Sequence, residues 1–113
     1  MHEVSLAAGI LQVVEQTRER DPFERVTLLH LEAGALSGVE LSALRFALEA
    51  IAPGTCLEQA QVDIDEPAAM AWCLPCAQSV PIRSRLDPCP QCGGAQLQAT
   101  SGTELRIVDL RVI

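Results

Sequence analysis

The first half of the chain alternates between helical and strand spacing of its apolar residues. One face of a helix over residues 4–20 would carry Leu6, Ile10, Val13, Val14 and Thr17. Ser5 is a candidate N-cap for this helix, and Asp21-Pro22 stops it. Residues 25–33 then alternate between apolar and polar side chains, which predicts a half-buried strand.

A second helix is predicted over residues 40–52. Its core face would be formed by Leu41, Leu44, Leu48 and Ile51, and Pro53-Gly54 ends it. Residues 60–65 alternate again, with Val62 and Ile64 directed inward. The chain up to residue 66 therefore has the element order αβαβ.

The remaining segments predict only strands. Short strands are expected at residues 68–72, 80–83 and 95–100, and a longer one at 104–113. The last strand changes phase around Val108-Asp109, which is typical of a β-bulge. We expect it to return to the first sheet.

The predicted fold class is α+β, a small mixed sheet with two helices on one face and the order αβαβ–β. The larger domain would comprise residues 1–66 and 101–113. A zinc-ribbon β domain over residues 67–100 would be inserted between two strands of the larger domain.

The chemistry of this inserted segment is indicated by its cysteines. Cys73-Leu74-Pro75-Cys76 and Cys89-Pro90-Gln91-Cys92 form two Cys-x-x-Cys knuckles separated by twelve residues. Each knuckle directs two thiolates at one point, so the four together predict a tetrahedral zinc site. The Gly93-Gly94 pair after the second knuckle provides the backbone freedom for such a turn, including φ > 0.

Two other uses of these cysteines remain open. A pair of disulfides would require an oxidising compartment, and a rubredoxin-like centre would hold iron in the same thiolate tetrahedron. All four candidate ligands are thiols. No His or carboxylate lies among them to replace one and leave a coordination position open. We therefore expect a structural metal and no catalysis there.

Composition narrows the range of partners and compartments. The chain has 113 residues, a net charge of −7, eight Arg and no Lys, and three aromatic residues. Nucleic acid is excluded as a partner because basic patches and stacking aromatics are lacking. We expect no signal peptide, no membrane segment and a reducing cytoplasm, with Cys56 acting as a small buried hydrophobe.

The amino terminus is a second candidate for metal chemistry. The α-amine of Met1, the peptide nitrogen of His2 and its imidazole can close chelate rings around one ion, and such nitrogen donors suit Ni(II) or Cu(II). Glu3 can add an oxygen donor, as can Glu40 if the two helices lie side by side. The alternatives also remain open: a frayed polar terminus, and a Glu40 carboxylate that only meets the helix dipole.

Several segments together resemble one protein family, and they cover the whole chain in order. The matching segments are Met1-His2-Glu3, residues 31–40, Leu44-Arg45-Phe46, Ala71-Trp72-Cys73, Cys89-Pro90-x-Cys92-Gly93 and residues 104–110. The chain resembles the HypA/HybF hydrogenase-maturation nickel metallochaperones. It departs from the family pattern at Glu40, where some members carry Asp, and at Ala33, where a larger aliphatic residue is common.

The resemblance implies a cytoplasmic nickel carrier and not an enzyme. Nickel would be bound by Met1, His2 and Glu3, with Glu40 as a further donor, and zinc by Cys73, Cys76, Cys89 and Cys92. The implied partners are the HypB GTPase, the [NiFe]-hydrogenase large-subunit precursor that receives nickel and, in some bacteria, urease maturation proteins. The alternative function is a zinc-ribbon adaptor that binds other proteins without transferring nickel.

Overall fold

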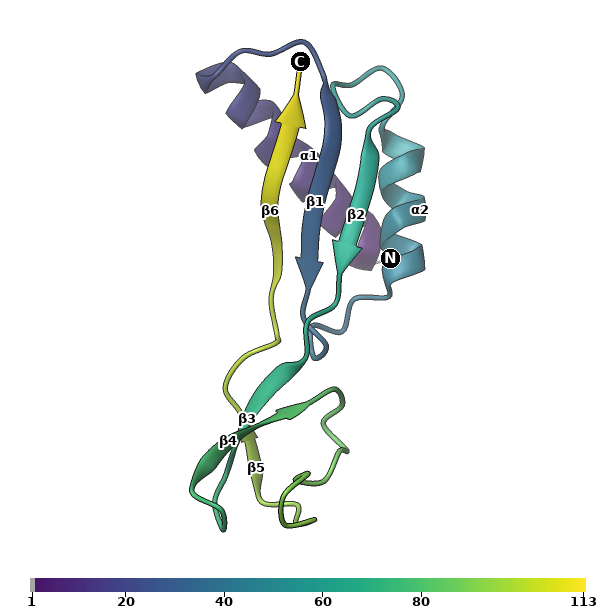
Figure 1. Ribbon diagram of the computed structural model, residues 1–113. Helices are drawn as coiled ribbons and strands as arrows, with labels where there is room; N and C mark the ends of the chain where they lie inside the picture. Colours follow the sequence, from purple (N-terminus) through teal and green to yellow (C-terminus); the bar gives the residue numbers. More distant parts are fainter. Residues whose placement is uncertain (1) are drawn as a thin grey trace. The chain divides into compact units, whose positions relative to one another are not determined.

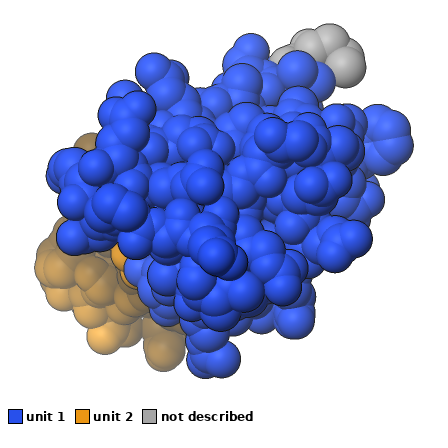
Figure 2. All heavy atoms as spheres, turned by 90° about the horizontal axis from the view of Figure 1, so that it is seen from above, with its two compact units in different colours: residues 1–31, 39–64, 107–113 blue, residues 32–38, 65–106 orange. Residues whose placement is uncertain are grey.

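A computed structural model describes residues 2–113 (Figure 1). Its elements are α1 (His2–Arg20), β1 (Val26–Ala33), α2 (Leu41–Ile51), β2 (Gln61–Asp65), β3 (Ala69–Cys73), β4 (Gln78–Ile82), β5 (Leu97–Ala99) and β6 (Leu105–Val112). The chain divides into two compact units, coloured separately in Figure 2. The first comprises residues up to 31, 39–64 and 107–113, and the second comprises residues 32–38 and 65–106.

The first sheet has the strand order β2-β1-β6. The arrows in Figure 1 show β1 and β2 running in one direction and β6 in the other. The parallel pair requires a crossover connection, and α2 provides it. The final strand thus returns to the first sheet as the sequence predicted, and the α+β fold class with a mixed sheet is confirmed.

Both helices cover the same face of this sheet and contribute to one core (Figure 1). The buried residues of these elements are Ala7, Ile10 and Val14 of α1, Leu44, Ala47 and Leu48 of α2, and Val26, Leu29, Leu31 and Ala33 of β1. Two details of the sequence prediction are wrong. Val13 is 48% exposed, because the buried face is centred on Ile10 and Val14 and Ala7 extends it. Ser5 is no cap, because α1 already begins at His2.

The second unit contains the antiparallel sheet β4-β3-β5. Along β3 the residues alternate: Ala69, Ala71 and Cys73 are buried, whereas Met70 and Trp72 are exposed. The core of this unit is small. It consists of Ala69, Ala71, Cys73, Val80, Ile82 and Cys89.

Two glycines of the second unit allow a close approach of three backbone segments. The Leu36 N–H donates to the Gly102 carbonyl at 2.8 Å, and the Gly34 N–H donates to the Glu104 carbonyl at 2.9 Å. A Cβ at Gly34 would collide with the Gly102 carbonyl, and a Cβ at Gly102 would collide with Ala69. Gly102 also has a φ of +89°, a region that disfavours any other residue.

None of the helices in residues 2–113 has the length and apolarity that crossing a membrane requires.

Candidate metal centres

The four predicted zinc ligands lie together in the second unit. Their Sγ atoms are all within 4.8 Å of one another. The Cys73 and Cys92 sulfurs are 3.7 Å apart, and those of Cys76 and Cys89 are 4.0 Å apart. Zinc–thiolate bonds of about 2.3 Å in a tetrahedron place the sulfurs about 3.8 Å apart. The cluster therefore fits a structural zinc ion.

The two knuckles have the same backbone construction. In each, the N–H four residues after the first cysteine donates to the carbonyl of that cysteine, Ala77 to Cys73 and Gly93 to Cys89, both at 2.8 Å. The donating residue has positive φ in both cases, 52° at Ala77 and 72° at Gly93. The sequence predicted this freedom at Gly93 but gave no signal for Ala77, because alanine rarely adopts this conformation.

Backbone N–H groups in the second knuckle stabilise the thiolate form of Cys89. The N–H groups of Cys92 and Gln91 donate to the Cys89 sulfur and lower its pKa to about 7. The Cys76 thiol shares hydrogen bonds with Cys73 and Cys92, which raises the pKa of Cys76 to about 12. The four sulfurs thus share protons that a bound zinc ion would displace.

At the start of α1, two of the predicted nickel donors are adjacent. The His2 Nδ1 atom is 3.7 Å from Glu3 Oε2, and the Glu40 backbone N–H donates to the same oxygen at 3.2 Å. The prediction for Met1 lies outside the described residues. Glu3 and Glu40 are therefore brought together, although they are far apart in the sequence.

The Glu40 carboxylate itself caps α2. It accepts a hydrogen bond from the Ala43 N–H at 2.6 Å, and the Ser42 hydroxyl lies 2.9 and 2.8 Å from its two oxygens. These bonds from Ser42 and Ala43 lower the pKa of Glu40, and the Glu40 N–H lowers the pKa of Glu3. Sequence reasoning did not single out Ser42. A hydroxyl two residues after a capping position was the available signal.

Residues 1–112 match the HypA family model, which is described as "Hydrogenase/urease nickel incorporation, metallochaperone, hypA". The chain belongs to the HypA family.

Two curated relatives, both named hydrogenase maturation factor HypA, align with almost the whole chain. A hydrogenase maturation factor HypA of Cupriavidus necator is 60% identical over 112 residues, which are 99% of this chain and 94% of the relative. The hydrogenase maturation factor HypA of Polaromonas naphthalenivorans is 57% identical over 99% of this chain and 97% of the relative.

A solved structure has a similar fold. The solution structure of the Ni metallochaperone HypA from Helicobacter pylori superimposes with a TM-score of 0.69, over 98% of this chain and 97% of that chain. At 18% identity this likeness concerns the fold alone.

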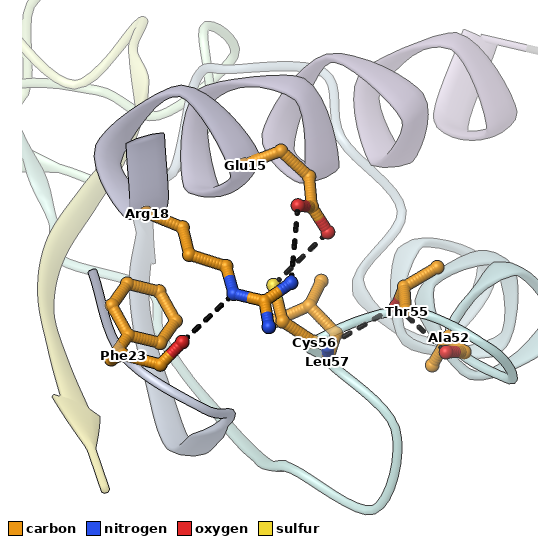
Figure 3. A network of polar contacts seen from close by, with 7 residues as sticks. All are labelled: Glu15, Arg18, Phe23, Ala52, Thr55, Cys56 and Leu57. Atoms are coloured by element: carbon orange, nitrogen blue, oxygen red, sulfur yellow. Dashed lines mark hydrogen bonds and ion pairs between the residues drawn. The ribbon is translucent and has the colours of Figure 1, made fainter. Parts of the chain in front are cut away.

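Cys56 is the one cysteine of this HypA family member that is not a predicted zinc ligand, and it belongs to the first unit. Its thiol donates to Glu15 Oε1 at 3.1 Å, and Arg18 reaches the other Glu15 oxygen at 3.9 Å (Figure 3). Arg18 is fixed in turn by a bond of 2.8 Å to the Phe23 carbonyl. Burial, followed by the Glu15 carboxylate, raises the pKa of Cys56 to about 11.

We expect Cys56 to be nearly inert toward iodoacetamide at pH 8. A raised pKa keeps the thiol protonated below pH 11, so its alkylation should be at least about a hundredfold slower than that of free cysteine. Mass spectrometry of the zinc-loaded chain measures this rate. Glu15→Gln removes the negative charge and should accelerate the reaction, and equal rates in both chains would contradict this account.

Proposed function

We propose that the chain is a nickel carrier. It binds one Ni(II) at the amino terminus through the Met1 amine, the backbone nitrogen and imidazole of His2, and Glu3. It then assists nickel insertion into a [NiFe]-hydrogenase precursor. The supporting observation is the Glu3 carboxylate, which is fixed beside His2 at the start of α1 in a chain of this family.

The exposure of these groups suits a carrier better than a catalyst. The His2 side chain is 62% exposed and that of Glu3 is 21% exposed, so an ion held there can be reached by a second protein. Nitrogen and carboxylate donors in tetragonal geometry suit Ni(II). Few donors at an accessible terminus allow both selective binding and release.

Nickel affinity should fall as the pH drops from about 8 to 6. Nickel must displace protons from an α-amine and an imidazole, groups that ordinarily titrate near 7.7–8.0 and about 6.5. Isothermal titration at several pH values measures the effect. An affinity that does not change with pH over this range would exclude these donors.

Any residue placed before Met1 should weaken nickel binding sharply, because the free amine is then replaced by a peptide bond. His2→Ala should remove the site, leaving zinc as the one tightly held metal. Nickel titration of untagged, extended and His2→Ala chains makes the comparison. Equal affinity in all three would place the nickel elsewhere.

The proposed partners are the HypB GTPase and the hydrogenase large-subunit precursor, with urease maturation proteins in organisms that use them. A cytoplasmic location follows from this role. Glu40 was predicted as a further donor, and that assignment stays a prediction.

One observation favours the alternative function, a zinc-ribbon adaptor. Met70 and Trp72 are 37% and 40% exposed on the outer face of β3, a surface that a protein partner can cover. An adaptor would have no nickel site that depends on His2, whereas a nickel carrier would lose its site in His2→Ala. Nickel titration of the wild-type and His2→Ala chains therefore distinguishes the two functions.

A further inference from the structure

The start of α2 carries a capping arrangement that is completed from a different helix. In an ordinary capping box, the N-cap side chain accepts from the N3 backbone N–H, and the N3 side chain accepts from the N-cap N–H. The first half is present here, since the Glu40 carboxylate accepts from Ala43 N–H at 2.6 Å. Residue N3 is Ala43, which has no acceptor for the second half.

Glu3 of α1 supplies the missing acceptor. Its Oε2 atom lies 3.2 Å from the Glu40 backbone nitrogen, where the side chain of an N3 glutamate would otherwise lie. Glu3 and Ala43 also line the same hollow between the two helices. The orientation of Glu3 thus depends on where the capping turn presents the Glu40 N–H.

Three contacts already use the Glu40 carboxylate. Both oxygens lie within 2.9 Å of the Ser42 hydroxyl, and Oε2 also accepts from the Ala43 N–H. A carboxylate that turned away to bind nickel would lose these bonds and leave the first turn of α2 uncapped, at a cost of about 1 kcal/mol. The observed orientation of the Glu40 carboxylate is that of an N-cap of α2.

We propose that Glu40 and Ser42 are positioning residues of the nickel site, and that the Glu40 carboxylate stays outside the nickel coordination sphere. Glu40 acts on nickel through its backbone N–H, which orients the donor Glu3, and Ser42 keeps the cap in place. Hydrogen-bonded groups of this kind usually change metal affinity about 10–100-fold when removed. The inference rests on the proposed nickel function.

Ala43→Gln tests the orientation of Glu3 without touching either glutamate. A glutamine at N3 completes the capping box within α2 and competes with Glu3 for the Glu40 N–H. We expect nickel affinity to fall about tenfold while α2 keeps its stability. The control is Glu49→Gln, which places the same side chain at an exposed position of the same helix, away from the cap and outside the hollow that Glu3 and Ala43 line.

Glu40→Asn separates capping from coordination. Asparagine caps a helix as well as any residue, but it brings no negatively charged oxygen to nickel. A positioning role predicts affinity within about threefold of the wild type and an unchanged nickel X-ray absorption spectrum. Ser42→Ala, compared with the exposed Ser79→Ala, should lower the affinity about tenfold with the same spectrum.

Amide exchange of the metal-free chain provides a readout that needs no nickel. Glu3→Ala removes the acceptor, so the Glu40 amide proton should exchange faster, whereas the Leu48 amide in the centre of α2 should be unaffected.

The outcomes separate the inference from the function on which it rests. One pair of results would overturn the inference alone. Glu40→Asn would bind nickel at least tenfold more weakly and lose an oxygen donor in the X-ray absorption spectrum, and Ser42→Ala would bind nickel normally. A wild-type chain without a His2-dependent nickel site would overturn both. An unchanged nickel affinity in Ala43→Gln would also contradict the inference, because the orientation of Glu3 would then not affect the nickel-bound state.

Discussion

Removal of zinc is expected to unfold the second unit. Its core consists of six small or medium residues, of which two are zinc ligands, Cys73 and Cys89. So small an apolar core rarely holds a fold of this size without a metal, which contributes about 10–16 kcal/mol in comparable sites. We expect strong chelation to abolish amide protection in β3 and β4.

Trp72 makes this transition directly measurable. It is the one tryptophan of the chain, it precedes the ligand Cys73, and it is 40% exposed. Its emission should move to longer wavelength on chelation and return when zinc is added back.

Substitutions test the same expectation. Cys92→Ala removes an exposed ligand and should reproduce the effect of chelation, whereas Cys56→Ala should leave the second unit folded. A second unit that kept its amide protection without zinc would show that the metal is not its main source of stability.

Gly102→Ala should destabilise the second unit by about 3–5 kcal/mol, the combined cost of a positive φ and of overpacking. The residue has a φ of +89°, and its new methyl group would meet both Cα and Cβ of Ala69. Backbone atoms cannot rotate away as a flexible side chain would. Chemical denaturation of the zinc-loaded chain, followed by Trp72 emission, measures the loss.

Two other glycines separate these causes. Gly93, also in the second unit, has a φ of +72° with nothing near its absent Cβ, so Gly93→Ala should show only the conformational cost, about 1–2 kcal/mol. Gly34 lies outside the positive-φ region, so Gly34→Ala, whose methyl group would collide with the Gly102 carbonyl, should show only the steric cost. A Gly102→Ala chain no less stable than Gly93→Ala would mean that the close approach is absent in solution.

The sequence predicted those parts of the fold that depend on residue spacing. Apolar periodicity predicted the two helices and the strands at residues 26–33 and 61–65. The return of the last strand to the first sheet was predicted from its place in the chain, after the inserted ribbon. The zinc ligands followed from the separation of the two Cys-x-x-Cys knuckles, since four thiols so spaced have few other uses.

Features that depend on tertiary contact could not be read in this way. Val13 shares the apolar character of Val14, but only the packing of α1 on the sheet decides which of the two is buried. The bond between Glu3 and the Glu40 N–H joins residues that no local rule connects. Sequence reasoning could place a carboxylate at position 40, but not decide whether it caps a helix or binds a metal.

The left-handed alanine in the first knuckle has a consequence for how such sites are recognised. Alanine in this conformation costs about 1–2 kcal/mol, far less than the contribution of about 10–16 kcal/mol from a structural zinc ion. Because the metal more than offsets the strain at Ala77, the position after the second cysteine is not restricted to glycine. A search that demanded glycine after each Cys-x-x-Cys pair would miss half of this zinc site.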